Sequence, residues 1–380
     1  MGGDGATYDA SRIQVLEGRE AIRKRPGMYV GSTGERGLHQ LVFEVVDRAV
    51  NEVLAGRARS VDLTLNPDGS VRVTDDGPGI PVAAAGDTET PSLEALLTRM
   101  PAAAQPGGRH TVTMGLFGIG PSVTNALSSR LTAEVRRNGT RWVQEYVRGE
   151  AVAPPARKGP TARTGTTIAF QPDADIFSTV ECSFDVLAQR FSELAFLNPN
   201  LTLALTDRRP TGQARSRRFS HPGGVRDLVA SLDAQAAAHA DIIGFEHEEP
   251  RMAGTMEVAL GWSDTAAARV RSFANSSPTP EGGTHVAGFR DGAAAAVNTF
   301  ARERQLLEAT EPDIGADRII ECLTVVVSVK LDRPEFEGAT RGLLGGAAVR
   351  ACVQEAVQEH MGTWLEEHPK LAAAVIGRTT

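Results

Sequence analysis

Lysine is nearly missing from this 380-residue sequence, because Lys24, Lys158, Lys330 and Lys370 are the only four among 40 basic residues. The other basic side chains are arginines, so few ammonium groups are available to bind phosphate. Acidic residues number 47, and the resulting net charge of −7 argues against a protein that coats nucleic acid over its whole surface. A local basic groove is compatible with this balance.

Cysteine and long apolar runs are also scarce. Cys182, Cys322 and Cys352 lie far apart without a Cys-x-x-Cys pair, which argues against a disulfide framework and against a zinc site. No stretch of 18 apolar residues occurs, and the first residues lack a basic segment followed by an apolar one. These absences predict a cytoplasmic protein that does not contact a membrane.

The length and the 41% content of hydrophobic residues suit two or three domains with cores of their own. A polar stretch over residues 206–224, rich in arginine, glycine and proline, is the expected boundary. Residues 82–112 show weak periodicity and are expected to form a loop or lid. Periodicity predicts helices over 37–56, 122–127 and 347–368, a hairpin of 61–65 with 71–73, and strands over 131–147, 166–170 and 323–329.

Three features could carry chemistry. On its helix Glu44 shares a face with Arg48 and Asn51, and the ordinary interpretation is a solvated stripe with an i, i+4 ion pair. Asp75 ends a strand before Gly-Pro-Gly, which suits either an Asp-Gly turn or a carboxylate that accepts a hydrogen bond from a nucleobase. Residues 115–120 precede a helix and have the pattern of a phosphate-binding loop, a weak signal by itself.

Together, in this order, the three features resemble the ATPase region of bacterial DNA gyrase B and its relative in topoisomerase IV. That superfamily also includes Hsp90, MutL and the histidine kinases. The resemblance covers essentially the whole chain, and the combination of GMYVGS with EGGTH distinguishes this family from the kinases and Hsp90. The matching segments are YDAS at 8–11, RPGMYVGS at 25–32, EVVD at 44–47, DDGPGIP at 75–81, TGT at 164–166 and EGGTHVAGF at 281–289.

The resemblance implies an α+β fold. Residues 1–12 are expected to be an N-terminal dimerisation arm. Residues 13–220 are expected to be an ATP-binding domain built as a two-layer sandwich, with helices on a mixed sheet. Residues 221–380 are expected to be a smaller α/β transducer domain, which reports nucleotide state to the rest of the enzyme.

The family's functional residues can be carried onto matching positions. Glu44 is expected to be the general base that orients and deprotonates the attacking water, Asp75 to hold the adenine amino group, and Arg341 to face the γ-phosphate. The residues expected to bind nucleotide are Tyr8, Asp47, Arg48, Asp75, Gly77, Ile80, Pro81, Gly115, Leu116, Phe117, Gly118, Ile119, Gly120, Thr166 and Arg341, and no metal ligand is assigned.

Several positions depart from the family's pattern. Arg48 stands where the family has an asparagine that binds magnesium, and a guanidinium has no lone pair to offer a metal. It could supply positive charge there, or pair with Glu44 and depress that residue's basicity. The other departures are Pro78 for an arginine, Thr111 for a lid lysine, Phe117 for a histidine and Arg341 for a loop lysine. The expected cofactor is therefore ATP, Mg²⁺ binding is in doubt, and hydrolysis is expected to be slow or absent.

Three functions remain open. The first is the nucleotide-gated dimerisation module of a gyrase B-like DNA topoisomerase without the DNA-cleavage-associated region, as an excised fragment or a short paralogue. It would form a homodimer through the arm and, within a longer chain, meet a gyrase A-type subunit and DNA. The second is a non-hydrolysing paralogue that binds nucleotide, a gyrase component or an aminocoumarin-type inhibitor at Asp75 and Arg137. The third, a kinase of the same superfamily, is poorly supported because no phosphoacceptor helix precedes the ATPase region.

Overall fold

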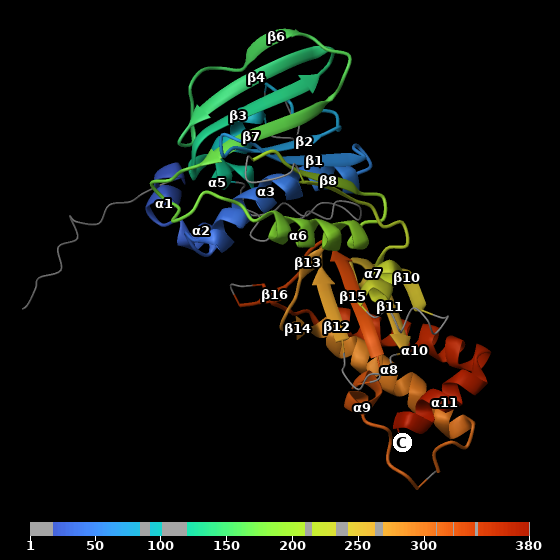
Figure 1. The fold of residues 1–380 in the computed structure, drawn as a ribbon. Coiled ribbons are helices and arrows are strands. Elements are labelled where there is room, and N and C mark those ends of the chain that lie inside the picture. Colours follow the sequence, from blue (N-terminus) through green and yellow to red (C-terminus); the bar gives the residue numbers. More distant parts are fainter. Residues whose placement is uncertain are drawn as a thin grey trace, which may run out of the picture.

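The computed structural model describes residues 18–83, 92–100, 120–209, 215–232, 242–262, 269–308, 310–321, 323–338 and 341–379. Two bodies of secondary structure follow one another along the chain, and Figure 1 shows the second below the first. No helix in these ranges combines the length and the apolar character needed to cross a bilayer.

The first body is built on a mixed sheet, in which nine strands are described. Its order is β5-β4-β3-β7-β2-β1-β8-β9, with β6 paired to β4. The β1–β8 pair is parallel, whereas β1–β2 is the antiparallel hairpin expected from the sequence. The strands are β1 Ser60–Leu65, β2 Val71–Asp75, β3 Ser128–Arg137, β4 Thr140–Val147, β5 Glu150–Ala151, β6 Ala156–Pro160, β7 Gly165–Pro172, β8 Thr202–Asp207 and β9 Arg215–Phe219.

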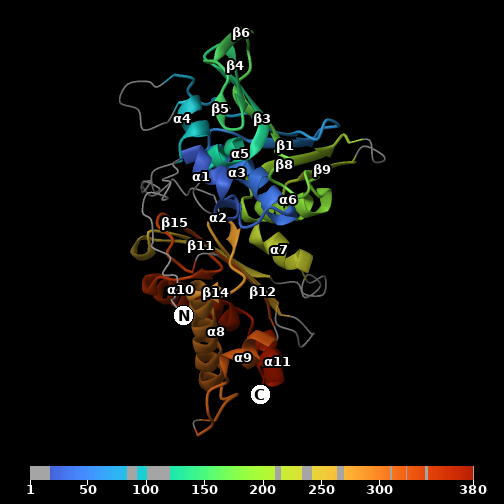
Figure 2. The same ribbon diagram turned by 90° about the vertical axis from the view of Figure 1, so that its left-hand side faces the viewer.

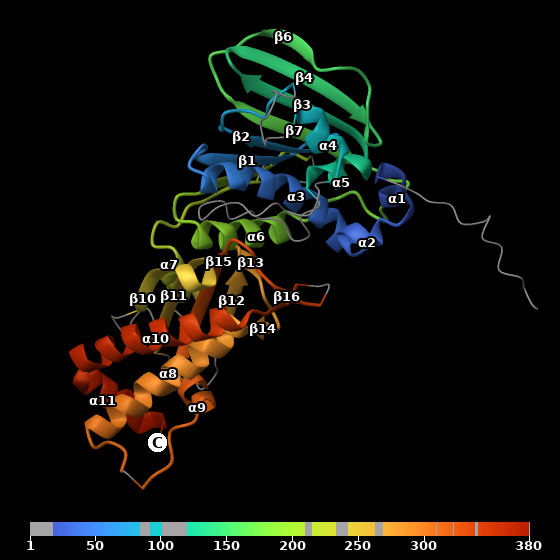
Figure 3. The ribbon, with the colours of Figure 1, turned by 180° about the vertical axis from the view of Figure 1, so that it is seen from behind.

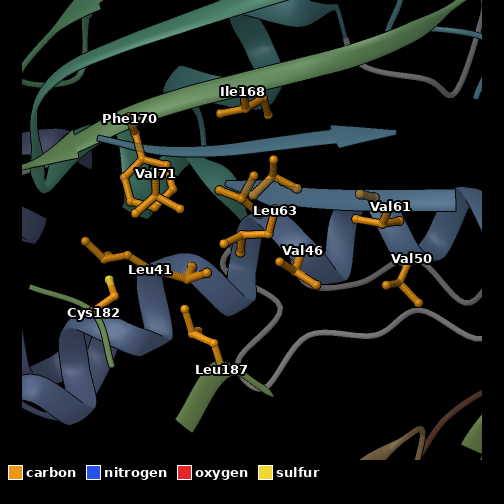
Figure 4. Close-up of a cluster of buried hydrophobic side chains, with 14 of the residues drawn as sticks. Leu41, Val46, Val50, Val61, Leu63, Val71, Ile168, Phe170, Cys182 and Leu187 are labelled. Carbon is orange, nitrogen blue, oxygen red and sulfur yellow. The ribbon is translucent and has the colours of Figure 1, made fainter. Parts of the chain in front are cut away.

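Helices cover one face of this sheet, as Figures 1 and 3 show from opposite sides. Side chains of β1 and β2 alternate between buried and more exposed positions, because only one face is covered. Figure 4 shows Leu41, Val46 and Val50 of α3 packed under Leu63 and Val61 of β1. The helices are α1 Gly18–Lys24, α2 Gly27–Val30, α3 Glu35–Leu54, α4 Leu93–Thr98, α5 Pro121–Ala126 and α6 Phe184–Leu197.

The second body combines a five-stranded sheet, of order β10-β11-β15-β12-β13, with long helices and a small sheet of order β14-β17-β16. Helices α8 and α10 pack closely because Gly288 and Gly292 have no side chains: a Cβ at either would lie 2.4–2.5 Å from a carbonyl oxygen of α10. The elements are α7 Val225–Leu232, β10 Ile243–Glu249, η2 Pro250–Met252, β11 Gly254–Trp262, β12 Arg269–Ala274, β13 Ser277–Pro278, β14 Gly282–Gly283, α8 Thr284–Glu303, α9 Ala316–Glu321, β15 Leu323–Leu331, β16 Phe336–Glu337, β17 Leu343–Leu344, α10 Ala347–Glu367 and α11 Pro369–Thr379.

A small apolar cluster joins the two bodies at the end of α6, where Phe196 and Leu197 pack with α7, β11, β12 and β15. Polar contacts flank it. Arg190 of α6 donates to the carbonyl oxygen of Ser276 at 2.9 Å, and Asn198 donates to the Ser276 hydroxyl at 3.2 Å. Figure 2 shows α6 directly above α7 and the second sheet. The bodies therefore meet through packed side chains as well as through the chain connection.

The structure confirms the expected α+β class, with helices on a mixed sheet. It also corrects one element, because residues 93–98 of the expected loop form helix α4. Ser92 caps this helix by accepting from the amide of Ala95 at 3.3 Å, and Leu93 and Leu97 are buried. Six residues with two buried leucines are too short to produce visible periodicity in a window of Ala, Gly, Pro and Thr.

Candidate functional site

Glu44 projects from the middle of α3 into the interior of the first body, where only 2% of its surface is exposed. The Gln40 side-chain amide, one turn earlier, donates to Oε1 at 2.8 Å. The backbone amide of Gly120, just before α5, donates to Oε2 at 3.1 Å. Both carboxylate oxygens are therefore held in place, which rules out the solvated-stripe interpretation of this side chain.

The surroundings of Glu44 favour its protonated form. Burial, and to a smaller extent the neighbouring Asp47, raise its pKa to about 7. The hydrogen bonds from Gln40 and Gly120 and the positive charge of Arg341 act in the opposite direction. A carboxylate with a pKa near neutrality exchanges protons readily at physiological pH, which is the property required of a general base.

Asp47 lies on the same helix and is also buried. Its Oδ1 has no hydrogen-bond partner among the described residues. Burial raises its pKa to about 6, and the charge of Arg190 on α6 limits the rise. The positive charge of Arg190 thus acts on Asp47. The same guanidinium donates a hydrogen bond to the carbonyl oxygen of Ser276 in the second body.

Asp75 ends β2, in the middle of the sheet, directly opposite Thr166 of β7. Its Oδ1 accepts from the backbone amides of Gly77 at 2.9 Å and Thr166 at 3.4 Å. The Thr166 hydroxyl accepts from the amide of Ile80 at 3.2 Å. The structure therefore brings four of the expected base-binding residues together at one end of the central strands β2 and β7.

Two glycines allow neighbouring backbone segments to approach each other closely at this end of the strands. A Cβ on Gly79, which has φ of 80°, would lie 2.7 Å from the carbonyl oxygen of Arg136. A Cβ on Gly165, with φ of 132°, would lie 2.2 Å from the carbonyl oxygen of Asp75. Arg137 donates to the carbonyl oxygen of Gly79 at 2.7 Å and so holds the turn that carries Ile80 and Pro81.

Arg48 does not pair with Glu44, the alternative that the sequence left open. Its Nη1 forms an ion pair with Oδ2 of Asp75, and its Nη2 lies 3.4 Å from the Thr166 hydroxyl and 3.6 Å from Glu52. Arginine is long enough to reach from α3 to the end of β2, and there it meets a carboxylate that is only 1% exposed. The expected depression of Glu44's basicity is also absent, since the pKa of that residue is raised.

Arg341 approaches this region from the second body. It lies between β16 and β17 in the left-handed region, with φ of 54°. Burial lowers the pKa of its guanidinium, and the Glu44 carboxylate acts against that shift. The two bodies therefore contribute opposite charges to one region.

Two groups of expected site residues lie outside the described residues: Tyr8 in the arm, and the loop residues Gly115, Leu116, Phe117, Gly118 and Ile119 together with Thr111. Gly120 is described and begins the approach to α5 with φ of 65°. In the described ranges, no group of three or more His, Cys, Asp or Glu side chains is arranged to hold a metal ion.

Sequence reasoning missed Gln40 and Arg190. Gln40 lies one helical turn before Glu44, so the i, i+4 relation between an amide and a carboxylate could have identified it. Arg190 had no such signal, because its proximity to Asp47 depends on how α6 packs against α3.

Comparisons with known proteins follow the same division of the chain. Residues 33–176 match the family of histidine kinase-, DNA gyrase B- and HSP90-like ATPases, and residues 224–380 match the DNA gyrase B family. DNA gyrase B of Streptomyces coelicolor is 44% identical over 98% of this chain and 57% of its own length. The novobiocin-resistant DNA gyrase B of Streptomyces niveus is 43% identical over the same shares.

Solved structures agree with this relationship. The 43K ATPase domain of Thermus thermophilus gyrase B, solved with an aminocoumarin, has a TM-score of 0.77 and 32% identity over 96% of this chain and 94% of its own. The ATP-binding domain of topoisomerase IV from Francisella tularensis has a TM-score of 0.80 and 27% identity, over 96% of each chain. The chain spans little more than half the length of the curated relatives, and it belongs to the DNA gyrase B family, of which it contains the ATPase and transducer region.

Proposed function

We propose that this chain binds a nucleoside triphosphate, ATP in the family, and acts as the nucleotide-gated dimerisation module of a gyrase B-like topoisomerase. The observation that carries the proposal is the buried Glu44, held by Gln40 and Gly120, with a pKa near 7 and the charge of Arg341 facing it. A base of this kind, beside a cation that can meet phosphate, suits attack of water on a phosphoryl group.

The remaining roles follow the sequence assignments. Asp75, Gly77, Ile80, Pro81 and Thr166 would line the base, and the loop that ends at Gly120 would enclose the phosphates. Asp47 would adjust the charge beside Glu44. Residues 1–12 would form the dimerisation arm, with Tyr8 reaching the nucleotide of the other protomer, residues 13–220 the ATP-binding domain, and residues 221–380 the transducer.

The family context extends the proposal to partners. A second copy of the chain, a gyrase A-type subunit and DNA would be engaged through a longer assembly. An aminocoumarin, the ligand class of the Thermus thermophilus structure, would approach Asp75 and Arg137. Arg137 supports this assignment because it already holds Gly79 beside the base-binding turn.

Magnesium fits this site poorly. At the family's ligand position Arg48 presents a cation paired with Asp75, and a guanidinium cannot donate a lone pair to Mg²⁺. We therefore propose that nucleotide binding depends little on Mg²⁺, and no step of the reaction is assigned to it.

The second candidate function is a non-hydrolysing paralogue that binds nucleotide or an inhibitor for regulation or resistance. The Arg48–Asp75 ion pair favours it, because one substitution alters both the metal position and the base site. Loss of a preorganised stabilising group commonly slows catalysis by about 100- to 1,000-fold, so hydrolysis should be far slower than is usual in the family.

A steady-state ATPase assay with and without Mg²⁺ separates the two functions. The enzyme function requires hydrolysis that Glu44→Ala abolishes and that survives Glu35→Ala, a change to an exposed carboxylate in the first turn of the same helix. Strong dependence of that hydrolysis on Mg²⁺ would contradict the poor fit of the metal. Binding of a non-hydrolysable analogue without such hydrolysis supports the paralogue. A folded protein that binds no nucleotide would refute the first function and the nucleotide-binding form of the second.

A further inference from the structure

Arg48 forms an ion pair with Asp75, the carboxylate that is expected to recognise the base. Its guanidinium bridges Asp75 and Thr166, which face each other across β2 and β7. Only 11% of the Arg48 side chain and 1% of the Asp75 side chain are exposed. The ion pair is therefore part of the site's interior and is only weakly screened by solvent.

The other oxygen of Asp75 is engaged as well. Oδ1 accepts from the amides of Gly77 and Thr166, while Oδ2 accepts from Arg48. Groups of the protein thus donate to both oxygens before any ligand arrives. The N–H of Arg48 thus donates to the carboxylate that the exocyclic amino group of adenine is expected to use.

An amino group that binds Asp75 must displace the Arg48 guanidinium or share the carboxylate with it. Hydrogen bonds in which both partners are charged are stronger than those in which a neutral amino group meets a carboxylate. Breaking a buried ion pair also leaves a charge without its partner. A 6-amino group therefore gains little at this carboxylate.

A carbonyl group meets a different surface. Arginine carries five N–H donors, and the contacts with Asp75, Thr166 and Glu52 use at most three of them. The remaining donors suit an acceptor, as arginine does when it reads O6 and N7 of guanine in nucleic acids. The site thus contains a guanidinium as well as the Asp75 carboxylate.

We propose that Arg48 determines base specificity here: by occupying Asp75 it removes the preference for a 6-amino purine, so that a 6-oxopurine nucleotide binds at least as well as an adenine nucleotide. The proposal rests on the proposed function, because it requires that the site take a purine nucleotide.

Calorimetric titration of the full chain with the non-hydrolysable imido analogues of ATP and ITP tests it. These analogues differ only at position 6 of the base, which is an amino group in the first and a carbonyl in the second, and at the adjacent N1, which carries a proton only in the second. Wild type should bind the ITP analogue as tightly as the ATP analogue, or more tightly. Arg48→Asn should favour the ATP analogue by at least about tenfold, since an acceptor released in a buried site discriminates by that order.

Arg57→Asn is the matched control. Arg57 also pairs with Glu52, at 2.8 Å, but it is 53% exposed and does not contact Asp75, so this variant should retain the wild-type ratio. Thermal unfolding verifies that each variant is folded, and Arg48→Gln replaces Arg48→Asn if the latter unfolds.

The outcomes of the titrations bear on the role of Arg48 in base specificity as follows. If wild type binds neither analogue while Arg48→Asn binds the ATP analogue, the guanidinium blocks the site for both bases, and the proposed acceptance of a 6-oxopurine is overturned. If wild type already prefers the ATP analogue as strongly as Arg48→Asn does, Arg48 does not determine specificity, although the nucleotide site remains. If no folded variant binds either analogue, the proposed function itself fails and this inference fails with it.

Discussion

The backbone amide of Gly120 donates to Oε2 of Glu44 over 3.1 Å, and so connects the segment before α5 to the buried carboxylate of α3. Gly120 is the last residue of the glycine-rich stretch that is expected to enclose phosphates. Any rearrangement of that stretch on nucleotide binding would change the donors around Glu44 and therefore its pKa. Among the described residues, this hydrogen bond thus couples the expected base to the segment before α5.

The raised pKa of Glu44 predicts a pH-dependent contribution to stability. Its value near 7 in the folded state exceeds the ordinary 4.5, so the unfolded state ionises first as pH rises. The free energy of unfolding should therefore fall between about pH 4.5 and 7 and be independent of this group outside that window. Glu44→Gln should remove about 1–3 kcal/mol of this fall. Urea unfolding of both proteins across the range measures it, and parallel pH profiles would contradict the prediction.

The Arg48–Asp75 ion pair predicts strong coupling between two substitutions. Asp75→Ala leaves a guanidinium with 11% exposure without its main partner and should cost about 3–5 kcal/mol. Arg48→Ala should cost less, because Asp75 keeps the amides of Gly77 and Thr166. The double variant should be more stable than the sum of the single effects predicts, by about 0.5–3 kcal/mol. Additive effects in denaturant titrations would show that the pair is energetically unimportant.

The hydrogen bond of Arg190 across the junction is expected to contribute to the stability of the contact between the two bodies. It donates to the carbonyl oxygen of Ser276 across their junction, so Arg190→Ala should cost about 1.5–3 kcal/mol, split a single calorimetric transition into two and raise the pKa of Asp47 further. Arg226→Ala is the control, because Arg226 makes a comparable 2.8 Å bond to the carbonyl oxygen of Ile242 within the second body alone. Identical calorimetric profiles for the two variants would exclude a special role for Arg190.

The proposed arm predicts that nucleotide binding and dimerisation can be separated by a deletion. Residues 1–12 are mostly small and polar, with Tyr8 as their one aromatic side chain, and they carry no apolar periodicity that would dock them on their own core. Deleting them should leave the affinity of the monomer for a non-hydrolysable analogue nearly unchanged and abolish any analogue-induced dimer seen by light scattering. Tyr8→Ala should weaken that dimer to a smaller extent. A dimer that persists after the deletion would assign dimerisation to another surface.

Much of the local structure could be read from the sequence. The three- and four-residue spacing along α3 predicted a helix that the structure places at Glu35–Leu54, and alternation predicted the hairpin of β1 with β2. The strand-like alternation expected over 131–147 corresponds to two strands, β3 and β4, separated by Asn138 and Gly139 with φ of 51° and 71°. Periods of two and of 3.6 are properties of neighbouring residues, so no tertiary information is needed to detect them.

The fold class, the family and the types of residue at the site could be inferred from the amino-acid sequence, because these depend on local periodicity and on short motifs. Which charged groups meet depends instead on how the elements pack in three dimensions. Arg48 lies four residues after Glu44, yet it pairs with Asp75, 27 positions away, and approaches Thr166, 118 positions away. Arg190 and Arg341 reach Asp47 and Glu44 only because α6 and the second body pack against the first. A long guanidinium can reach carboxylates on several elements, and the packing of helix on sheet, rather than spacing along the chain, determines which one it pairs with.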